Sequence, residues 1–410
     1  TDVVETGAGA VGTSVALARQ APGRRLQGVD GAGVGPGASA APAGAFAFAD
    51  IEPLATPGIM RKAPRWLFDP LGPLSIPLGY APKIAPWLWR FWRASRPDRY
   101  AEAVSAQARL MTLSRDALER QIVDVDGERL VQRDGQLQLY EGEAAFRASL
   151  PSWDARRRAG VAFRLLETAE AIAEIQPGLH PRFTHAGFTP DWMNAVDPRA
   201  WTDHLAAVFR ARGGVVSHSD VRAIAPRTDG VSLATAEGSI DSAQVVVAAG
   251  AWSHHLARTL GDRIPLETER GYNTTLPAGA FDLRTHLTFG AHGFVVTRIN
   301  GGVRIGGAVE LGGLDRAPDY RRAQVLLAKA AGFLPGLKVD GGVEWMGFRP
   351  SLPDSLPAIG PSPHAPRVVY AFGHGHLGLT QATGTAELVR DIVIGAAPAT
   401  SLNPYSPARF

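Results

Sequence analysis

The chain contains 410 residues, which is more than one ordinary hydrophobic core organises, so we expect two domains. Its 42 lysine and arginine residues nearly balance its 39 aspartate and glutamate residues, and no cluster of positive charge indicates a nucleic-acid partner. The sequence has no cysteine, which excludes disulfides, thiolate zinc sites, iron–sulfur clusters and a catalytic thiol.

The sequence also limits where the protein is expected to work. No run of about 18 apolar residues is free of prolines and charges, so we expect no membrane-spanning helix. The chain enters a strand-like segment at once, without the basic region and apolar run of a signal peptide. Because cysteine is absent as well, we expect a cytoplasmic location, and we predict no metal site.

The N-terminal segment predicts a strand–helix–strand unit. Residues 2–6 have the pattern of a short strand, residues 10–20 carry apolar positions at helical spacing, and residues 24–29 indicate a second strand. The turn between the first strand and the helix reads Gly7-Ala-Gly9-Ala-Val-Gly12, a Gly-x-Gly-x-x-Gly motif. Such a motif is weak alone, but a strand before it and a helix after it are typical of dinucleotide binding.

Each glycine of this motif has its own expected role. Gly7 permits the tight turn, Gly9 lets the backbone approach a diphosphate, and Gly12 allows the helix to pack closely on the strand. The diphosphate would lie against the free N–H groups at the start of the helix. Asp30 follows about 20 residues later and would accept hydrogen bonds from ribose hydroxyls. The motif does not choose between NAD and FAD.

The segment that follows alternates loops, helices and strands. Residues 31–44 are rich in glycine, alanine and proline and are expected to form a loop. A hairpin is expected at 130–140 around Asp134-Gly135. Helices are expected at 101–123, 143–159 and 167–176.

The stretch Trp87–Arg96 combines aromatic and basic residues. On a helix, one face would carry Trp87, Leu88, Phe91 and Trp92, and the opposite face would carry Arg90, Arg93 and Arg96. Such a helix suits peripheral docking on the anionic inner face of the cell membrane. It equally suits a helix that packs its aromatic face on the core and leaves its basic face solvated. Both interpretations stay open.

The second half of the chain begins with a helix expected at 195–212, with Asp197 as its N-cap and Pro198 in its first turn. Short strands are expected between 215 and 248, and the apolar run 243–249 predicts a buried strand. Residues 265–345 are expected to be rich in strands. A strand at 368–372 and an amphipathic helix at 380–394 are expected near the end.

Several segments together resemble the D-amino acid oxidase superfamily, and specifically its bacterial D-amino acid dehydrogenase branch, over nearly the whole chain. The C-terminal pair is the most specific, because Gly347-Phe-Arg349-Pro350 and Gly373-His-Gly-His-Leu-Gly-Leu-Thr380 resemble the substrate and flavin closure of the family. The segments are Gly7–Gly12 with Asp30, Gly35–Gly44, Asp197-Pro198, Val245–Trp252, Trp345–Gly360 and Gly373–Gly384.

This resemblance implies an α/β fold in which a discontinuous Rossmann-like FAD-binding domain is interleaved with an antiparallel-sheet substrate domain. The FAD-binding domain would comprise 1–85, 195–258 and 345–410. The substrate domain would comprise 86–194 and 259–344. FAD would lie extended, with its ring system at the interface of the two domains.

The resemblance also implies FAD-dependent oxidation of a D-amino acid to an imine or 2-oxo acid, by hydride transfer from Cα to flavin N5. The sequence of the last loop, Gly373–Thr380, is closest to that of enzymes that act on D-proline or hydroxy-D-proline. Electrons would pass to a quinone or another acceptor. Two alternatives stay open: an amino acid oxidase that returns electrons to O₂, and a non-catalytic flavoprotein that serves assembly or binding.

Four residues are candidates for the substrate site. Arg349 is the strongest, because a guanidinium pairs bidentately with a substrate carboxylate and orients Cα, and the carboxylate-binding arginine of the family falls in the corresponding motif. Tyr272 is expected to bond the same carboxylate or to line the pocket. His374 and His376 could bond the flavin or the substrate. Hydride transfer from a neutral amine needs no strong protein base, so a flavin-facing or structural role is favoured for both histidines.

The resemblance assigns the cofactor contacts mainly to glycines. Three residues depart from the family pattern, since Glu5 and Gln27 stand in strands where apolar residues are expected, and Pro42 stands where asparagine is frequent. A buried carboxylate such as that of Glu5 is costly unless it is paired. The predicted cofactor-binding residues are Gly7, Gly9, Gly12, Asp30, Gly37, Ser39, Gly44, Val221, Gly250, Trp252, Gly375, Gly378, Leu379 and Thr380.

Overall fold

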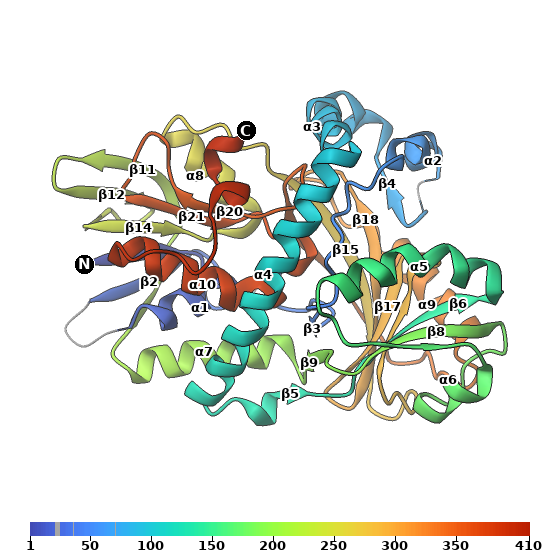
Figure 1. Cartoon of the computed structure of the whole chain (residues 1–410). Helices are drawn as coiled ribbons and strands as arrows, with labels where there is room; N and C mark the ends of the chain where they lie inside the picture. The colour runs from blue at the N-terminus through green and yellow to red at the C-terminus, as the bar shows by residue number, and fades with distance from the viewer. Residues whose placement is uncertain (21–24, 36, 70) are drawn as a thin grey trace.

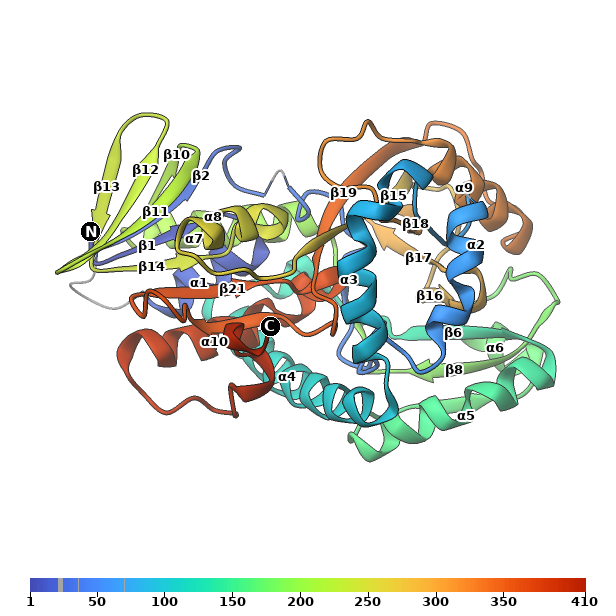
Figure 2. The same ribbon diagram turned by 90° about the horizontal axis from the view of Figure 1, so that it is seen from above.

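Two large sheets organise the computed structural model of the chain, which describes residues 1–20, 25–35, 37–69 and 71–410 (Figure 1). Within these residues one sheet has six strands and the other has nine. The sheets lie side by side, and the long helix α4 (Pro97–Asp124) crosses from one half of the molecule to the other (Figures 1 and 2). No helix in the described part of the chain combines the length and apolar character that a bilayer crossing needs.

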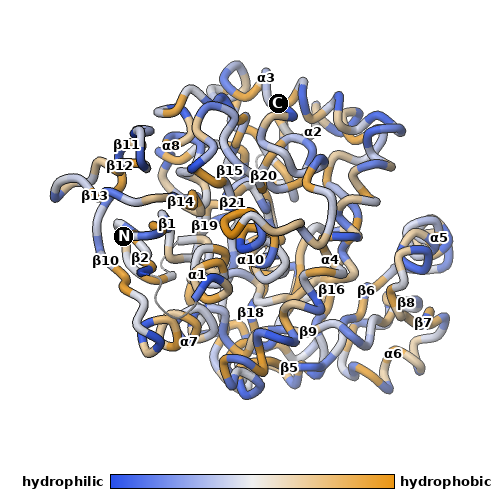
Figure 3. The backbone as a smooth tube through the Cα atoms, turned by 60° about the vertical axis from the view of Figure 1, so that its left-hand side comes forward, coloured by the Kyte–Doolittle hydropathy of each residue, from blue (hydrophilic) through white to orange (hydrophobic). Residues whose placement is uncertain are grey.

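The first sheet, called the parallel sheet below, is parallel at every pair except β20–β21. Its strands β14 (Gln244–Val247) and β21 (Val368–Phe372) are largely apolar, as expected where both faces of a sheet are covered by other elements. Hydrophobic residues accordingly cluster around β21 in the middle of the molecule, whereas the outlying helix α5 (Gly142–Arg158) is mainly hydrophilic (Figure 3). In spatial order the strands are β10 (Val215–His218), β2 (Leu26–Asp30), β1 (Val3–Thr6), β14 (Gln244–Val247), β21 (Val368–Phe372) and β20 (Ala358–Pro361).

The second sheet, called the mixed sheet below, is largely antiparallel, with parallel pairing only at β6–β16 and β4–β18 among its described strands. Helix α9 (Arg321–Phe333) packs on one face and closes a separate apolar cluster. In spatial order the strands are β19 (Val343–Ser351), β15 (Glu267–Leu276), β18 (Gly302–Glu310), β17 (Phe294–Ile299), β16 (His286–Phe289), β6 (Gln136–Glu141), β8 (Phe183–Thr189) and β7 (Arg164–Leu166), with β4 (Leu74–Ser75) beside β18.

Two smaller sheets and the helices complete the fold. The small sheets are β11 (Val221–Arg227), β12 (Gly230–Thr235) and β13 (Ser239–Ser242), and β3 (Ala45–Phe46), β9 (Met193–Ala195) and β5 (Val131–Gln132). The other α-helices are α1 (Ala10–Ala18), α2 (Ala63–Phe68), α3 (Ala81–Ala94), α5 (Gly142–Arg158), α6 (Ala169–Ile175), α7 (Pro198–Ala211), α8 (Ser253–Thr259), α9 (Arg321–Phe333) and α10 (Gly378–Ile394). The 3₁₀ turns are η1 (Ile59–Lys62), η2 (Leu78–Tyr80), η3 (Glu128–Leu130), η4 (Gly250–Trp252), η5 (Gly290–His292), η6 (Gly375–Leu377), η7 (Asn403–Tyr405) and η8 (Pro407–Arg409).

The predicted α/β fold class is confirmed, because the chain passes back and forth between the parallel and mixed sheets. The predicted domain boundaries differ from the strand pairing at two places. They assign β4 and most of β19 to the FAD-binding domain, whereas both strands pair within the mixed sheet. Since β19 joins the mixed sheet and leads into β20 of the parallel sheet, it links the two halves.

Most local sequence signals are found in the structure. Helices α4, α5, α6 and α7 are present, and Asp197 caps α7 by accepting the backbone N–H groups of Arg199 at 2.8 Å and Ala200 at 3.4 Å. The predicted hairpin at 130–140 is wrong, because β5 pairs with β9 whereas β6 pairs with β8 and β16. Helix α9 interrupts the region expected to hold strands. Residues 24 and 36 lie outside the described residues.

The two polar residues expected to disturb the parallel sheet both have partners. The carboxylate of Glu5 lies 2.9 Å from Arg19 Nη2, and both side chains are almost fully buried. Burial raises the pKa of Glu5 to about 7, and the charge of Arg19 opposes only part of this rise. Gln27, on β2, donates a 2.8 Å hydrogen bond to Ser217 on β10. The sheet therefore tolerates these residues through side-chain pairing.

The helix at Trp87–Arg96 differs from the predicted arrangement. Ile84, Trp87 and Phe91 of α3 are buried, but Trp89 and Trp92 are 52% and 51% exposed. The prediction that Trp92 shares the buried face is wrong, because at about 100° per residue it lies well around the helix from Trp87 and Phe91. The solvent-facing side of α3 therefore carries tryptophan together with arginine.

Candidate active site

The turn between β1 and α1 is closed so tightly that two of its glycines cannot be replaced without backbone movement. Gly7 has a φ of +104°, and a Cβ atom there would lie 2.3 Å from the carbonyl oxygen of Ala248. A Cβ atom on Gly12 would lie 1.9 Å from the carbonyl oxygen of Gly7. Gly9 has more room, since its Cβ would meet only Ser39 Oγ, at 3.1 Å. Gly9 is thus not required as glycine by packing within the protein, and it lines the cavity.

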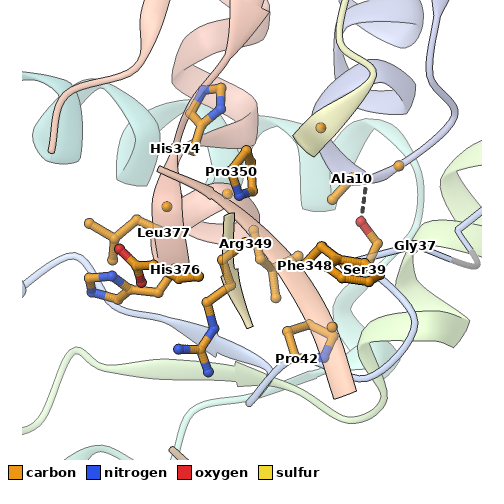
Figure 4. Close-up of a pocket in the computed structure, with 18 of the residues that line it drawn as sticks. Ala10, Gly37, Ser39, Pro42, Phe348, Arg349, Pro350, His374, His376 and Leu377 are labelled. Atoms are coloured by element: carbon orange, nitrogen blue, oxygen red, sulfur yellow. Dashed lines mark hydrogen bonds between the residues drawn. The ribbon is translucent and has the colours of Figure 1, made fainter. Parts of the chain in front are cut away.

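Asp30 and Ser39 fix the backbone around this turn. Asp30 accepts the N–H groups of Ala8 and Ala32, each at 2.8 Å, through its two carboxylate oxygens. Ser39 Oγ accepts the N–H of Ala10 at 3.0 Å at the start of α1 (Figure 4). This arrangement presents a helix N-terminus, with its favourable dipole, beside an acidic residue at the end of β2.

The loop that follows Ser39 is held by two residues of the mixed sheet. Asn273 on β15 donates a 2.7 Å hydrogen bond to the carbonyl oxygen of Ala41, and Arg304 on β18 donates a 2.6 Å bond to that of Pro42. Burial lowers the pKa of Arg304 to about 10, and the charge of Asp197 opposes this shift. Gly44 closes the loop with a φ of +80°. The departure at Pro42 therefore removes a backbone N–H but leaves the loop anchored.

A single cavity of about 1170 Å³ runs from this turn to the mixed sheet. Gly12 and Thr380 lie outside the lining: Gly12 supports the turn, and Thr380 Oγ1 bonds the backbone of Ala45 and Ala47. The lining includes these predicted residues: Gly7, Gly9, Asp30, Gly37, Ser39, Gly44, Val221, Gly250, Trp252, Tyr272, Arg349, His374, Gly375, His376, Gly378 and Leu379.

Arg349 extends from β19 into the cavity (Figure 4). Its guanidinium lies over Gly271 of the neighbouring strand, where a Cβ atom would come within 2.4 Å of Cζ and Nη2. No described residue forms a hydrogen bond or direct ion pair with the guanidinium. Burial lowers the pKa of Arg349, and the negative charge of Glu269 opposes this effect. A desolvated cation without a direct partner is suited to bind an anionic ligand.

Tyr272 does not join Arg349. In the strand register Arg349 is opposite Glu269, and Tyr272 is three residues from Glu269, so Tyr272 projects from the other face of the sheet. Its hydroxyl donates a 2.6 Å hydrogen bond to Glu310, and the residue is fully buried. Of the two predicted roles, binding the carboxylate does not fit this geometry, whereas lining the pocket does.

The two histidines of the last loop have different surroundings. His374 is 3% exposed and its Nε2 lies 2.9 Å from Thr385 Oγ1. Burial lowers the pKa of His374 to about 3, so this ring is neutral and structural. His376 is partly exposed to the cavity, and its Nε2 lies 3.2 Å from Asp50 Oδ2. The two histidines, for which the same range of roles was expected, therefore differ in burial and in hydrogen-bond partners.

The sequence did not identify several residues that lie in or beside the cavity. Asp50 and Glu269 are carboxylates of the lining, Gly271 makes room for Arg349, and Asn273 and Arg304 anchor the loop. A charged or amide residue inside a strand otherwise rich in β-branched residues is the signal that could have identified the β15 residues, since buried polar groups need partners. Asp50 gives no comparable signal, because it lies in a loop.

The cavity fits an extended dinucleotide cofactor. One end offers the α1 N-terminus and Asp30, and the other is closed by η6 and the start of α10. Its volume of about 1170 Å³ exceeds the roughly 300–1,000 Å³ of common small-molecule pockets, which leaves space for a substrate beside a cofactor. Gly7, Gly9, Asp30 and Ser39 would hold the nucleotide end.

Known proteins resemble the chain over its whole length. A D-amino-acid oxidase from Bradyrhizobium diazoefficiens is 35% identical, covering 98% of this chain and 97% of its own. A D-amino acid dehydrogenase from Paramagnetospirillum magneticum is 31% identical, covering 100% and 98%. Glycine oxidase from Geobacillus kaustophilus shares the fold with a TM-score of 0.80 at 21% identity, covering 100% and 98%. L-proline dehydrogenase from P. horikoshii does so with a TM-score of 0.76 at 19% identity, covering 100% and 97%.

The family model described as FAD dependent oxidoreductase matches residues 2–392, which is nearly the full chain. Together with the glycine turn, Asp30 and a cavity large enough for cofactor and substrate, this match settles the interpretation that the Gly-x-Gly-x-x-Gly motif alone left open between NAD and FAD. The chain belongs to the FAD dependent oxidoreductase family, and its cofactor is FAD.

Proposed function

We propose that this chain oxidises a D-amino acid to an imine, which water converts to a 2-oxo acid or which persists as a cyclic imine. The observation that carries the proposal is the Arg349 guanidinium, which is desolvated, faces the cavity and has no direct partner among the described residues. Such a group suits a substrate carboxylate and would orient Cα. Bound FAD supplies the hydride acceptor, N5 of the flavin ring.

The relatives support an amino acid as the substrate class. The two most similar relatives described above are named a D-amino-acid oxidase and a D-amino acid dehydrogenase. A solved structure with the same fold is named L-proline dehydrogenase, but it is only 19% identical in sequence to this chain and supports the fold alone. Within the proposed class, the sequence of the last loop favours D-proline or hydroxy-D-proline. The desolvated guanidinium of Arg349 in the cavity supports a catalytic role over a non-catalytic one.

We further propose that electrons leave to a quinone or another acceptor, as in a dehydrogenase. The names of the relatives include both chemistries, so an oxidase that uses O₂ is the second candidate. The two are separated by the hydrogen peroxide formed per substrate consumed in air. Little peroxide, with fast turnover once an artificial acceptor is added, supports a dehydrogenase. Near-stoichiometric peroxide at full speed identifies an oxidase.

A panel of D- and L-amino acids, assayed by bleaching of the flavin under anaerobic conditions, tests the substrate class. We expect rapid reduction by D-amino acids, fastest with proline-like ones, and none by their L-enantiomers. Protein that carries FAD and is bleached by none of them would contradict the proposal. Bleaching by L-amino acids alone would overturn the stereochemical part.

Arg349→Ala tests the anchoring role. A desolvated charge pair that loses one partner typically costs about 2–5 kcal/mol, so kcat/KM should fall about 30- to 3,000-fold. Arg349→Lys should recover only part of the loss, because a point charge lacks the fork. An amine without a carboxylate serves as the control, since its poor turnover should barely respond. Near wild-type kcat/KM in Arg349→Ala would refute the assignment. Loss of FAD from the variant would show that Arg349 has a structural role instead.

The exposed side of α3 supports a contact with the membrane, where a quinone acceptor would be found. Trp89 and Trp92 are half exposed, and Arg93 lies over the Trp89 ring at 4.8 Å from its centroid. Lys83 and Arg90 are exposed on the same helix. We propose that this surface docks on anionic lipid, because tryptophan and arginine suit the headgroup region.

Sedimentation with vesicles tests this contact. Wild-type protein should bind vesicles rich in phosphatidylglycerol and should ignore neutral phosphatidylcholine vesicles. The Trp89→Ser/Trp92→Ser variant should lose most of that binding while it keeps its FAD. A Val123→Ser variant, which changes an apolar residue that is 82% exposed on α4, is the matched control and should bind like wild type. Absence of wild-type binding, or an undiminished double variant, would refute the contact.

A further inference from the structure

Asp50 and His376 form a hydrogen-bonded pair inside the cavity that contains Arg349. Asp50 lies in the loop that follows β3, and His376 lies in η6 just before α10. The carboxylate Oδ2 and the imidazole Nε2 are 3.2 Å apart, and each side chain is about one-third exposed, 35% and 32%. Both His376 and Arg349 line this cavity, and Figure 4 shows them on the side away from Ser39. The pair therefore borders the same cavity as Arg349 and is partly exposed.

The charge of Asp50 is maintained by its neighbours. Burial acts to raise the pKa of Asp50, but the hydrogen bond and charge of His376, with the charge of Arg156, outweigh it and leave that pKa below its usual value. Arg156 is itself paired, since its Nη1 lies 3.2 Å from Glu52 Oε2. Tyr100 donates a 3.0 Å hydrogen bond to the other oxygen of Glu52. Asp50 therefore presents a negative charge that its surroundings do not neutralise completely.

The backbone on both sides of the pair is fixed. The N–H of Asp50 donates a 2.9 Å hydrogen bond to the carbonyl oxygen of Ala47, and Gln107 donates a 2.8 Å bond to the carbonyl oxygen of Asp50. His376 follows Gly375, whose φ of +56° sets the sharp turn into α10. The pair is thus preorganised, as a site for a charged group requires.

On the basis of the amino acid oxidation proposed above, we propose that the Asp50–His376 pair receives the ammonium group of the substrate and takes its proton. A zwitterionic amino acid brings two opposite charges into one cavity. Arg349 is the cation for the carboxylate, and Asp50 is the accessible anion for the ammonium group. Hydride loss from Cα requires a nitrogen lone pair, so the ammonium group must first lose a proton.

The proton step is balanced within the pair. One N–H bond of the ammonium group breaks, its electron pair stays on nitrogen, and the proton bonds to the imidazole ring of His376. The carboxylate of Asp50 then offsets the imidazolium charge, as carboxylates do beside catalytic histidines. After the imine leaves, the imidazolium returns its proton to water.

The other acid–base groups of the cavity are less suited to this task. His374 is buried and its Nε2 is bonded to Thr385. Glu269 is 4% exposed, one of its oxygens accepts the hydroxyl of Ser351 at 2.6 Å, and the other has almost no exposed surface and no hydrogen-bond partner among the described residues. His255 also lines the cavity and is exposed, but no described carboxylate forms a hydrogen bond or ion pair with its ring. Asp50 and His376 differ from it because they form a hydrogen-bonded carboxylate–imidazole pair at the cavity.

The pH dependence of kcat/KM in the FAD-loaded enzyme tests the pair. His376→Gln keeps a hydrogen-bonding side chain but cannot accept the proton. At neutral pH its kcat/KM should fall about 10²- to 10⁴-fold, the usual contribution of a general base. The loss should shrink about tenfold per pH unit as the pH rises, because the substrate then reaches the enzyme already deprotonated. A variant with the wild-type pH profile would overturn the proposal.

Asp50→Asn provides an independent readout by binding. It should weaken binding of the D-amino acid to enzyme whose flavin has been reduced beforehand, so that no turnover occurs, but leave unchanged the calorimetric Kd of the matching carboxylic acid that lacks the amino group. Equal weakening of both ligands would mean general damage to the cavity and would overturn the amine assignment. Unchanged binding of both would overturn it as well.

A second His–Asp pair supplies the matched control. His364 Nδ1 lies 2.6 Å from Asp262 Oδ1, and His364 is not among the described residues that line the cavity. His364→Gln should keep the wild-type profile. Wild-type turnover is measured first: its absence for every amino acid overturns the proposed function, whereas normal wild-type turnover with an unaltered His376→Gln overturns only the role of the pair.

Discussion

Glu269 on β15 lies directly opposite Arg349 on β19, so the two opposite charges occupy the same face of the mixed sheet. Ser351 donates a 2.6 Å hydrogen bond to one oxygen of Glu269, and the other oxygen has no partner among the described residues. The charge of Glu269 opposes the effect of burial on the pKa of Arg349. Glu269 therefore stabilises the buried positive charge of Arg349.

Glu269→Gln should separate the folding role of this charge from substrate binding. Without it, the free energy of unfolding should fall by about 1–3 kcal/mol, the scale of a charge interaction at an effective dielectric constant of about 20. A carboxylate ligand should bind more tightly, because no anion competes for Arg349. Chemical denaturation and calorimetric titration with a simple carboxylic acid measure both effects. Unchanged stability and affinity would show that Glu269 does not act on Arg349.

Gly271→Ala should displace the Arg349 guanidinium without unfolding the protein. The new Cβ atom would lie 2.4 Å from Cζ and Nη2 of a flexible side chain, which can move aside. A misplacement of about 1 Å can cost about 10²-fold in rate, so we expect a loss of kcat/KM of that order with normal FAD content.

The control for this substitution is Gly332→Ala in α9, where a Cβ atom would meet nothing within 4 Å. It should keep full activity and should stabilise the helix by about 0.5–1 kcal/mol. If Gly271→Ala were as active as Gly332→Ala, the position of the guanidinium would not limit catalysis.

Replacing Gly12 and replacing Gly9 in the cofactor turn should have different effects, one on folding and the other on FAD binding. Gly12→Ala should disrupt folding, because its Cβ would lie 1.9 Å from the carbonyl oxygen of Gly7. Gly9→Ala should fold, because its Cβ meets only Ser39 Oγ at 3.1 Å, but should bind FAD more weakly by obstructing the diphosphate. Circular dichroism and the flavin absorbance of purified protein distinguish the two outcomes. Full FAD content in Gly9→Ala would argue against the predicted diphosphate position.

The buried pair Glu5–Arg19 makes stability depend on pH. Because the folded-state pKa of Glu5, about 7, exceeds its ordinary value of 4.5, its favourable contribution is complete below 4.5 and is lost as the pH rises through about 7. Arg19→Met removes the counter-charge and should raise that pKa further. The variant should therefore lose little stability near pH 5 and about 3–5 kcal/mol near pH 8.

The double variant Glu5→Val/Arg19→Met is the test of this interpretation. Replacing a buried ion pair by apolar residues is often neutral or stabilising, so most of the lost stability should return and its pH dependence should weaken. Urea unfolding at both pH values measures this. A double variant as unstable as the single one would show that the loss comes from packing.

The sequence by itself determined the features that depend on local backbone chemistry. Gly7, Gly9 and Gly12 were recognisable because a tight strand-to-helix turn leaves no space for side chains at two of them. The capped start of α7 at Asp197 was recognisable for a similar reason, since the cap bonds lie within three residues. Resemblance to the family then identified FAD and pointed to Arg349, which the structure places in the cavity.

Only the tertiary structure decided which side chains meet. Tyr272 and Arg349 both lie on strands of the mixed sheet, but the register places them on opposite faces, and register depends on the pairing of distant strands. Asp50 and His376 are 326 positions apart and meet because α10 packs beside the loop after β3. Glu5 was expected to disturb its strand, yet burial against Arg19 provides the partner. Local sequence carries no record of such contacts, because long-range packing creates them.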